Sequence, residues 1–327
     1  MKIFGIGFSG YIGEAVAAKL LADEHTLTGL ARSETAKITL QKQGITPISG
    51  SMADTDVISQ AARKADAAVL IATGGFLTEA VGKGEQYVNC VEAFMSAFEG
   101  THKPFMQLAG TGLWLGASTV KKVVVVDESI PPSPPRFYAE LMPGLEKVQN
   151  SAARGVRGFT IHPGQVYGRR GGYINPLSRR FEDFRKNGAI HCVYPGEATV
   201  SYTHVDDLAN AIATGLEIAR AGESYFVITD TCDIITISRM VSRVCGLNGR
   251  LSYVDEKTMG DKCGWVGVGD FSTVLIANSD KIKREMGWKP QGLSVVDELQ
   301  RLIDEKVDVN EIYPMKSRRK TVENLKI

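Results

Sequence analysis

KIFGIGFSGYIG, residues 2–13, joins a short apolar run to a helical pattern through Gly7, Gly10 and Gly13. The pattern predicts a strand, a tight turn and a helix. A helix N-terminus can approach a pyrophosphate closely only if three positions lack a Cβ: the bend of the turn, the point of closest approach to the phosphate and the contact between helix and strand. Glycine is the residue without a Cβ, and the three glycines are spaced to occupy these positions. The chain holds 34 glycines, so a triplet alone is weak evidence. Its place after the first strand, at the start of an alternating series, indicates a dinucleotide-binding turn rather than an ordinary loop.

Composition places the chain among ordinary globular proteins. Its 327 residues are 43% hydrophobic and 23% charged, with a net charge of +1, so nothing favours a nucleic acid or a membrane surface as partner. We expect a small-molecule substrate instead. The five cysteines show neither C-x-x-C nor metal-ligand spacing, which predicts reduced thiols and no metal site. No run is apolar enough to span a bilayer, and the apolar N-terminal run holds the glycines rather than a signal peptide, so we expect a cytoplasmic protein.

Strands and helices alternate along the first half of the chain. Strands are predicted at 25–31, 45–48, 67–72, 104–109 and 158–162, and helices at 14–21, 34–43, 54–63, 86–98 and 136–154, the last interrupted by Pro143 and Gly144. This order predicts an α/β fold, a Rossmann-type doubly wound parallel sheet, in residues 1–168. Residues 110–135 form a long loop with a β-like run at 122–126. Such a loop is often functional.

The second half is less regular. A helix at 205–220 and a strand at 224–229 predict that residues 202–230 return to the first sheet. Helices are expected at 235–245, 278–286 and 293–305, with a glycine-rich loop between Gly260 and Gly269. We therefore predict a smaller, discontinuous C-terminal substrate domain made of residues 169–201 and 231–327.

The end of the second predicted strand indicates the cofactor. Arg32 and Ser33 follow it directly, where a carboxylate would accept a hydrogen bond from a free ribose 2′-hydroxyl. A guanidinium and a hydroxyl suit a 2′-phosphate instead, which favours NADP(H) over NAD, with NAD as the alternative. Arg32 as a solvated surface residue stays open. The fourth strand ends in Thr73 and Gly74, small enough for the backbone to lie close to a cofactor.

Six motifs occur in order along nearly the whole chain: GFSGYIG at 7–13, ADAAVLIAT at 65–73, VNCV at 88–91, HPGQVYG at 162–168, YTHVDDLA at 202–209 and NSDKIKREMGWKP at 278–290. They resemble the extended short-chain dehydrogenase/reductase superfamily, in particular the NAD(P)-dependent epimerase/dehydratase family. Together with the glycine turn and the strand ends, the resemblance predicts a set of cofactor contacts: Gly7, Ser9, Gly10, Tyr11, Ile12, Gly13, Arg32, Ser33, Ala72, Thr73, Gly74, Tyr138, Pro163 and Val166.

The resemblance also implies a catalytic Tyr-x-x-x-Lys on the helix after the fifth strand, with a Ser or Thr at that strand's end. Residues i and i+4 share a helix face, so the lysine can lower the tyrosine's pKa and help it exchange a proton with the substrate oxygen. Tyr138 stands at the tyrosine position, but Met142 stands at the lysine position. Thr111 is the hydroxyl nearest the strand end. Tyr138 and Thr111 are the predicted catalytic pair, with a packed tyrosine and a plain turn residue as alternatives.

Other polar residues are interpreted as structural. His162 replaces a family arginine and is expected to be a strand-end histidine. Asp206 and Asp207 are expected to open the helix at 205–220, because acidic side chains favour helix N-termini. Four arginines could hold a diphosphate or be solvated charges: Arg169, Arg170, Arg179 and Arg180.

Three functions are compatible with the sequence. The first is an NADP(H)-dependent oxidoreductase acting on a carbonyl or secondary alcohol of a small molecule or sugar nucleotide. The second is a non-redox isomerase or cyclase on the epimerase fold, and the third a dinucleotide-sensing binding protein. Because Met142 stands where the family has its lysine, the non-redox enzyme and the binding protein are favoured more than they are for the family in general. The resemblance further implies a homodimer through the helices that flank the fifth strand.

Overall fold

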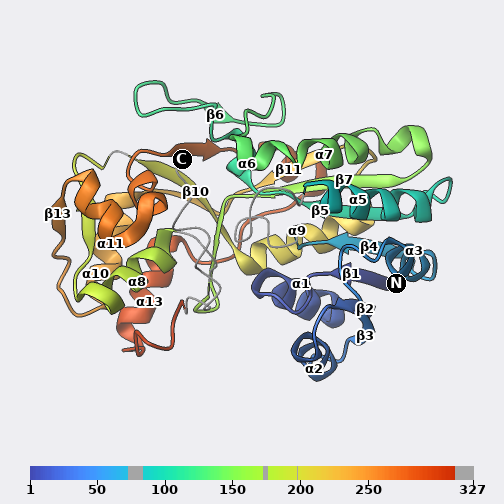
Figure 1. The fold of residues 1–327 in the computed structure, drawn as a ribbon, viewed down its shortest axis with the longest axis horizontal. Helices are drawn as coiled ribbons and strands as arrows, with labels where there is room; N and C mark the ends of the chain where they lie inside the picture. The colour runs from blue at the N-terminus through green and yellow to red at the C-terminus, as the bar shows by residue number, and fades with distance from the viewer. Residues whose placement is uncertain (73–83, 172–175, 197, 314–327) are drawn as a thin grey trace.

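The computed structural model describes residues 1–72, 84–171, 176–196 and 198–313 (Figure 1). Its larger sheet has seven parallel strands in the order β11-β7-β5-β4-β1-β2-β3. The strands are β1 (Lys2–Ile6), β2 (Thr26–Ala31), β3 (Thr46–Ser49), β4 (Ala67–Leu70), β5 (Pro104–Leu108), β7 (Arg157–Pro163) and β11 (Ser224–Val227). This confirms the predicted α/β class, and the strand order reverses between β1 and β4, where doubly wound sheets bind their ligands.

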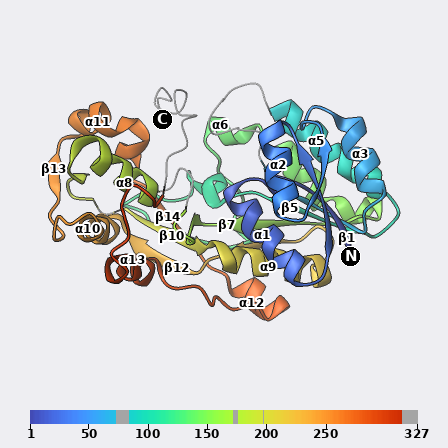
Figure 2. The same cartoon turned by 90° about the horizontal axis from the view of Figure 1, so that it is seen from below.

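Helices cover both faces of the larger sheet (Figures 1 and 2). On one face, α1 (Tyr11–Ala22) and α9 (Val205–Ile218) bury aliphatic side chains in one apolar cluster. On the other, α3 (Thr55–Arg63), α5 (Gly84–Phe98) and α7 (Met142–Gln149) contribute to a second cluster. The helix α2 (Glu34–Lys42) lies beside β2 and β3 and buries Leu40. Because both faces are covered, the central strands are apolar throughout rather than alternating.

A second, smaller sheet has five strands. Its order is β12-β10-β14-β6, with β8 also paired to β10, and the strands are β6 (Val125–Val126), β8 (Gln165–Tyr167), β10 (Thr199–His204), β12 (Asp230–Asp233) and β14 (Val274–Ala277). A separate pair joins β9 (His191–Val193) to β13 (Ser252–Val254). A third apolar cluster is built around these strands by α8 (Pro176–Asn187), α10 (Ile234–Val244), α11 (Glu256–Gly269) and α13 (Val295–Asp304). The short helix α12 (Asp280–Met286) lies against β11 and α9.

Strand β11 pairs with β7, so residues 224–227 lie in the larger sheet, whereas residues 202–204 belong to β10 of the smaller sheet. The smaller sheet draws β6 and β8 from residues before 168 and the remaining strands from later ones. The exact domain boundaries stay a prediction.

Two predicted elements are corrected. Residues 260–269 are not a loop but belong to α11, which bends at Gly264 with φ +74°. The helix forms because the Asp255 carboxylate accepts from the Thr258 N–H at 2.7 Å at its start, and Met259 is fully buried. The β-like run at 122–126 forms a strand only at Val125 and Val126.

The predicted helix at 136–154 is divided into α6 (Arg136–Ala139), α7 and a 3-10 turn, η2 (Ser151–Arg154). The first break precedes Pro143. A proline has no N–H to donate to the carbonyl four residues earlier, and its ring clashes with that carbonyl. For Pro143 this carbonyl belongs to Ala139, so one continuous helix cannot include both residues, and α6 ends at Ala139. Tyr138 and Met142 therefore lie on different helices.

Candidate cofactor and active site

The glycine turn after β1 is closely packed. Gly7 has φ +111°, a conformation that favours glycine, and a Cβ there would lie 2.9 Å from the backbone nitrogen of Ala72 at the end of β4. A Cβ on Gly13 would lie 1.9 Å from the Gly7 carbonyl oxygen. The turn, the start of α1 and the end of β4 can approach one another only because these positions lack side chains.

The start of α1 offers backbone donors. Gly10 is the N-cap and has no side chain to cap the helix. The N–H groups of Tyr11, Ile12 and Gly13 belong to the first turn, where backbone N–H groups have no acceptor within the helix. Ser9 lies half-buried in the same turn. Donors at a helix N-terminus beside a surface with no Cβ fit a pyrophosphate, so the residues present fit a dinucleotide cofactor.

The side chain of Tyr11 is fixed by contacts with the segment after β8. Its hydroxyl donates to the Gly168 carbonyl at 2.9 Å, just beyond β8, and its ring fills the space next to Gly171. The hydroxyl proton of Tyr11 is therefore already bonded within the protein. Val166 lies within β8, and Pro163 ends β7 with its carbonyl 3.8 Å from the place of a Cβ on Gly110. These residues gather at the carboxyl edge of the larger sheet.

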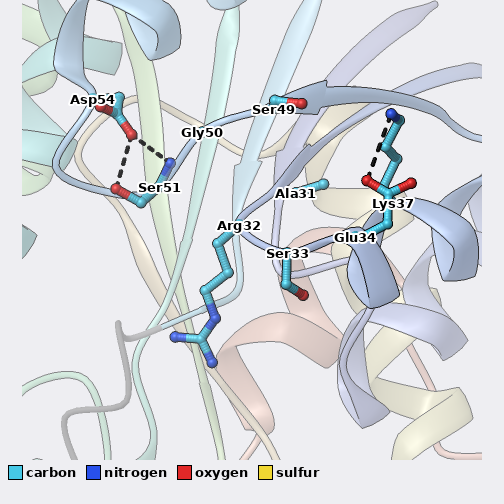
Figure 3. A pocket seen from close by; sticks show the side chains of 9 residues that line it. All are labelled: Ala31, Arg32, Ser33, Glu34, Lys37, Ser49, Gly50, Ser51 and Asp54. Carbon is cyan, nitrogen blue, oxygen red and sulfur yellow. Dashed lines mark hydrogen bonds and ion pairs between the residues drawn. The ribbon is translucent and has the colours of Figure 1, made fainter.

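A cavity of about 330 Å³ lies beyond the end of β2 (Figure 3). Arg32 extends from the strand end and forms no hydrogen bond or ion pair with any residue that the structure describes. The hydroxyl of Ser33 caps α2 by accepting from the Ala36 N–H at 3.2 Å. Both carboxylates of the cavity are engaged. Asp54 accepts from the N–H and hydroxyl of Ser51 at 2.6 and 2.9 Å, and Glu34 lies 3.7 Å from the Lys37 ammonium.

The predicted catalytic pair comes from neighbouring segments. Thr111 starts the 3-10 turn η1 (Thr111–Trp114) directly after β5 and is 3% exposed. Tyr138 on α6 is half-buried, and a Cβ on Gly112 would lie 2.7 Å from its ring and 3.0 Å from its hydroxyl. The structure therefore brings the Tyr138 hydroxyl to the segment that carries Thr111.

Burial raises the pKa of Tyr138 to about 12, opposed only by the positive charge of Arg179. A lysine one turn later would have opposed it more strongly, but Met142 is uncharged and the helix is broken before it. The Tyr138 phenol is consequently protonated at neutral pH.

Two of the four candidate arginines are buried rather than solvated. The Arg179 Nε lies 2.7 Å from Asp270 Oδ2, its Nη2 bonds the other oxygen, and the Arg180 Nη2 lies 3.1 Å from Asp270 Oδ2. Arg180 is fully buried over the Phe271 ring. Among the described residues, neither its Nε and Nη1 nor the Tyr202 hydroxyl has a hydrogen-bond partner. The other two form surface ion pairs, Arg169 with Asp206 and Arg170 with Glu305.

His162 is part of the core. Its Nδ1 lies 2.7 Å from the Ala109 carbonyl oxygen, and its ring lies between Trp114 and Phe226 at centroid distances of 4.8 and 5.3 Å. Burial lowers its pKa to about 4, so the ring is neutral. A neutral, hydrogen-bonded ring among aromatic side chains has the structural role expected for it.

The start of α9 is likewise structural. The Nδ1 of His204 accepts from the Asp206 N–H at 3.3 Å and caps the helix. Asp207 is 1% exposed and accepts from the N–H groups of Gln291 and Gly292 at 2.7 and 3.0 Å and from the Thr229 hydroxyl at 2.7 Å. Its carboxylate ties α9 to the segment before α13.

One polar cluster was not predicted from the sequence. The side chains of Asp183, His191 and Cys263, from α8, β9 and α11, place potential metal-ligand atoms within 4.8 Å of one another. Asp183 already accepts from the His191 N–H at 2.5 Å and from the His191 Nδ1 and Asn187 Nδ2 at 2.8 Å each. No spacing rule could have joined residues so far apart in the chain. Asp270 was missed for the same reason.

Thr73 and Gly74, two of the predicted cofactor contacts, lie outside the described residues. None of the helices within the described part of the chain has both the length and the apolar character that crossing a bilayer requires.

Comparison with known proteins identifies the family. The sequence profile of the NAD-dependent epimerase/dehydratase family matches residues 3–228. An uncharacterized protein of Saccharomyces cerevisiae is 23% identical over 316 residues, covering 91% of this chain and 98% of that protein. A UDP-glucose 4-epimerase of Corynebacterium glutamicum is 24% identical over 318 residues, covering 89% and 91% of the two chains.

Solved structures show the same fold. A UDP-glucuronic acid 4-epimerase from Bacillus cereus, solved with UDP-glucuronic acid and NAD, superposes with a TM-score of 0.74 at 17% identity, over 94% of this chain and 99% of that one. A UDP-glucose 4-epimerase from Thermotoga maritima gives a TM-score of 0.75 at 17% identity, over 93% and 98% of the two chains. At these identities the likeness establishes the fold. With the profile match over more than half of its length, the chain belongs to the NAD-dependent epimerase/dehydratase family.

Proposed function

We propose that the protein is an NADP(H)-dependent oxidoreductase that acts on a carbonyl or secondary alcohol of a small molecule. The observation that supports the cofactor is the cavity after β2, where Arg32 is unpaired among the described residues and both carboxylates are engaged. A ribose 2′-phosphate would be held there by the Arg32 guanidinium, the Ser33 hydroxyl and the N-terminus of α2. An NAD-binding site of this fold carries an acidic side chain at the end of β2 instead.

The residues around the glycine turn would hold the pyrophosphate, and the bound cofactor would supply or accept a hydride. Tyr138 would donate its proton to the substrate oxygen, and the Thr111 hydroxyl would hydrogen-bond the same oxygen. Because the pKa of Tyr138 is about 12, the phenol is ready to donate a proton but slow to accept one at neutral pH. This favours reduction of a carbonyl over oxidation of an alcohol.

A sugar nucleotide is the substrate class suggested by the names of three of the similar proteins, which are UDP-sugar 4-epimerases. Arg179 and Arg180 share one carboxylate, Asp270, so the pair leaves surplus positive charge at Arg180. That charge supports a substrate with an anionic group.

A second function, a non-redox isomerase, cyclase or binding protein that keeps the dinucleotide, is favoured by one observation. Tyr138 lacks the lysine that the family mechanism needs, and the helix break separates it from position 142. Such a protein would bind the dinucleotide without consuming NADPH in the presence of any carbonyl compound.

Calorimetric titration with NADPH, NADH and their oxidised forms tests the cofactor. In Arg32→Ala we expect the Kd for NADPH to rise about 10- to 100-fold, the loss of a charge-assisted phosphate contact, while the Kd for NADH is unchanged. Lys42→Ala, at the exposed far end of the same helix, is the matched control and should change neither. Equal affinity of the wild type for NADPH and NADH would reject the proposed preference, and binding of no dinucleotide would reject the oxidoreductase.

A further inference from the structure

Three polar side chains meet where α8, β9 and α11 pack together, and Figures 1 and 2 show α8 and α11 side by side at the end of the molecule away from the larger sheet. Asp183 comes from α8, His191 from β9 and Cys263 from α11. A carboxylate oxygen, a ring nitrogen and the Sγ of these residues lie within 4.8 Å of one another, the one such group in the described part of the chain. This mixture of oxygen, nitrogen and sulfur atoms is a donor set that zinc prefers.

The group lies in the interior rather than on a solvated face. The Asp183 side chain is 0% and the His191 side chain 7% exposed, and Cys263 is half-buried against the third apolar cluster. Removing a carboxylate from water is costly unless it finds partners in the protein. The expected absence of a metal site rests on cysteine spacing alone, which carries no information about residues that packing brings together.

The Asp183 carboxylate has room for a further partner. Its Oδ1 accepts from the His191 Nδ1 and the Asn187 Nδ2 at 2.8 Å each, and its Oδ2 accepts from the His191 N–H at 2.5 Å. A carboxylate has about four acceptor positions, so these bonds orient it and leave one position open. Among the described residues, the His191 Nε2 has no hydrogen-bond partner. The ring can therefore carry its proton on Nε2 and offer the lone pair of Nδ1 to a metal ion.

We propose that Asp183, His191 and Cys263 bind a zinc ion, with the fourth position left to water. The ion takes the place of the proton between the Asp183 carboxylate and the His191 Nδ1. That proton moves to Nε2, and the Cys263 thiol loses its proton to solvent, so the site with its ion has no net charge. Zinc bonds of about 2.0–2.1 Å to oxygen and nitrogen and about 2.3 Å to sulfur place tetrahedral ligand atoms roughly 3.3–3.6 Å apart. Side-chain rotations that move these atoms by about 1 Å reach this spacing.

The thiolate selects the metal and the three elements indicate its role. Magnesium and calcium take oxygen ligands, whereas a thiolate with an imidazole suits zinc. The ion would join α8, β9 and α11. Arg179 and Arg180 lie one turn before Asp183 on α8, and Asp270, their shared partner, directly follows α11. The zinc ion would therefore hold together the two helices that support this buried ion cluster, which is a structural role. The inference does not depend on the proposed function.

Zinc titration of the untagged full-length chain tests the site. The protein is stripped with a chelator and reloaded with zinc alone, in competition with a chromophoric zinc indicator. We expect a single site with a Kd below about 1 μM. X-ray absorption at the zinc edge should show one sulfur neighbour at about 2.3 Å among nitrogen and oxygen neighbours at about 2.0–2.1 Å. Zinc at about a hundredfold excess over the Kd should also raise the melting temperature by about 3 °C or more.

Two variants and a matched control test the ligands. Cys263→Ser and His191→Gln each remove one ligand, and we expect either change to raise the Kd for zinc about 100-fold or more. Cys245→Ser removes another half-buried thiol that lies outside the group, and it should bind zinc like the wild type. Cobalt reports the thiolate directly. The cobalt-loaded wild type and Cys245→Ser should show a sulfur-to-cobalt charge-transfer band in the near ultraviolet, and Cys263→Ser should lack it.

Thermal melting in metal-free buffer shows whether each variant is folded. His191→Gln loses the side-chain bond to Asp183, so Cys263→Ser carries the test if the histidine variant does not fold. The proposal is overturned if the stripped wild type binds no zinc at about 10 μM, if the bound zinc has no sulfur neighbour, or if Cys263→Ser binds zinc as tightly as the wild type.

Discussion

At the scale of single residues, the proposed reaction depends on how burial and charge act on the pKa of Tyr138. Its phenol has a pKa of about 12 because desolvation is opposed only by Arg179. An acid with a raised pKa keeps its proton as the pH rises. Tyr138 should therefore stay protonated between pH 6 and about pH 10, and we expect no loss of its proton to lower the rate of carbonyl reduction in this range.

We expect Tyr138→Phe to lose at least about 100-fold in kcat for carbonyl reduction, because the variant lacks the proton donor but keeps the ring's packing. Steady-state rates of NADPH consumption across this pH range measure both effects. A wild-type rate that falls with an apparent pKa between 7 and 9, and that no longer does so in Tyr138→Phe, would show that the phenol is activated after all.

His162 makes the folded state sensitive to acid. Its pKa is about 4 in the folded protein against an ordinary 6.5, so between these values the unfolded chain binds a proton that the folded chain does not. Stability is thus fully present above pH 6.5 and falls as the pH approaches 4, by about 3 kcal/mol for this group. In His162→Gln this contribution is absent. Urea denaturation at pH 7.5 and 4.5 should show the wild type losing more stability than the variant, and equal losses would contradict the buried neutral ring.

Residue roles were predictable from the sequence where a local backbone constraint defines them. Gly7 and Gly13 could be identified because their spacing, together with their place between the first strand and the first helix, puts them at the turn and at the helix–strand contact. The buried ion cluster of Arg179, Arg180 and Asp270 could not, since its members are brought together only by the packing of α8 against the segment after α11. Charged side chains in a sequence are expected in solvent unless a partner is known.

At the scale of elements, the approach of α1 to β1 depends on Gly13. A Cβ there would lie 1.9 Å from the Gly7 carbonyl oxygen, so Gly13→Ala must move the helix away from the strand. We expect a loss of stability of about 2 kcal/mol or more, together with loss of dinucleotide binding. Chemical denaturation and calorimetry measure the two effects.

Gly10→Ala is the matched control for this prediction. A Cβ on Gly10 comes within 3.3 Å of the same Gly7 oxygen, a tight contact that a small shift relieves, and the N-cap conformation is open to alanine. Its stability should stay within about 1 kcal/mol of the wild type. Equal destabilisation by the two substitutions would mean that the close contact at Gly13 does not govern packing.

The predicted helices and strands agree with the structure where the sequence pattern is regular, and they differ from it where tertiary packing decides the local structure. The alternation of strands and helices in the first half of the chain predicted the parallel sheet, because strand and helix patterns there follow one another regularly. The glycine-rich residues 260–269 were misassigned, because glycine lowers helix propensity while the burial of Met259 against the second half of the molecule offsets it. The split between α6 and α7 followed from Pro143, although its effect begins before the proline itself.

At the scale of the whole molecule, the Asp270 cluster should matter to both sheets. Asp270→Ala leaves two guanidinium groups without their shared carboxylate in the interior, and we expect a loss of about 3–5 kcal/mol. Because the chain passes between the two sheets several times, we expect both halves to unfold together.

Fluorescence of single-tryptophan variants can follow each half during urea unfolding. Trp288 reports on the cluster beside the larger sheet and Trp114 on the cluster of the second half. Both probes should shift by the same amount in Asp270→Ala. Asp280→Ala, which breaks an exposed 3.8 Å pair with Lys283, should cost under about 1 kcal/mol. A shift confined to the Trp114 probe would show that the halves unfold independently.

The late arrival of β11 also affects how the protein is made. During translation the ribosome releases β7, residues 157–163, well before residues 224–227, which pair with it. At bacterial or eukaryotic synthesis rates the interval is on the order of several seconds. Throughout it the nascent sheet exposes the apolar edge of β7, an open template for wrong strand pairing. The connectivity that places a second sheet between β7 and β11 thus gives the emerging chain a window in which a chaperone would be most useful, and shortening that window by circular permutation should raise the yield of folded protein.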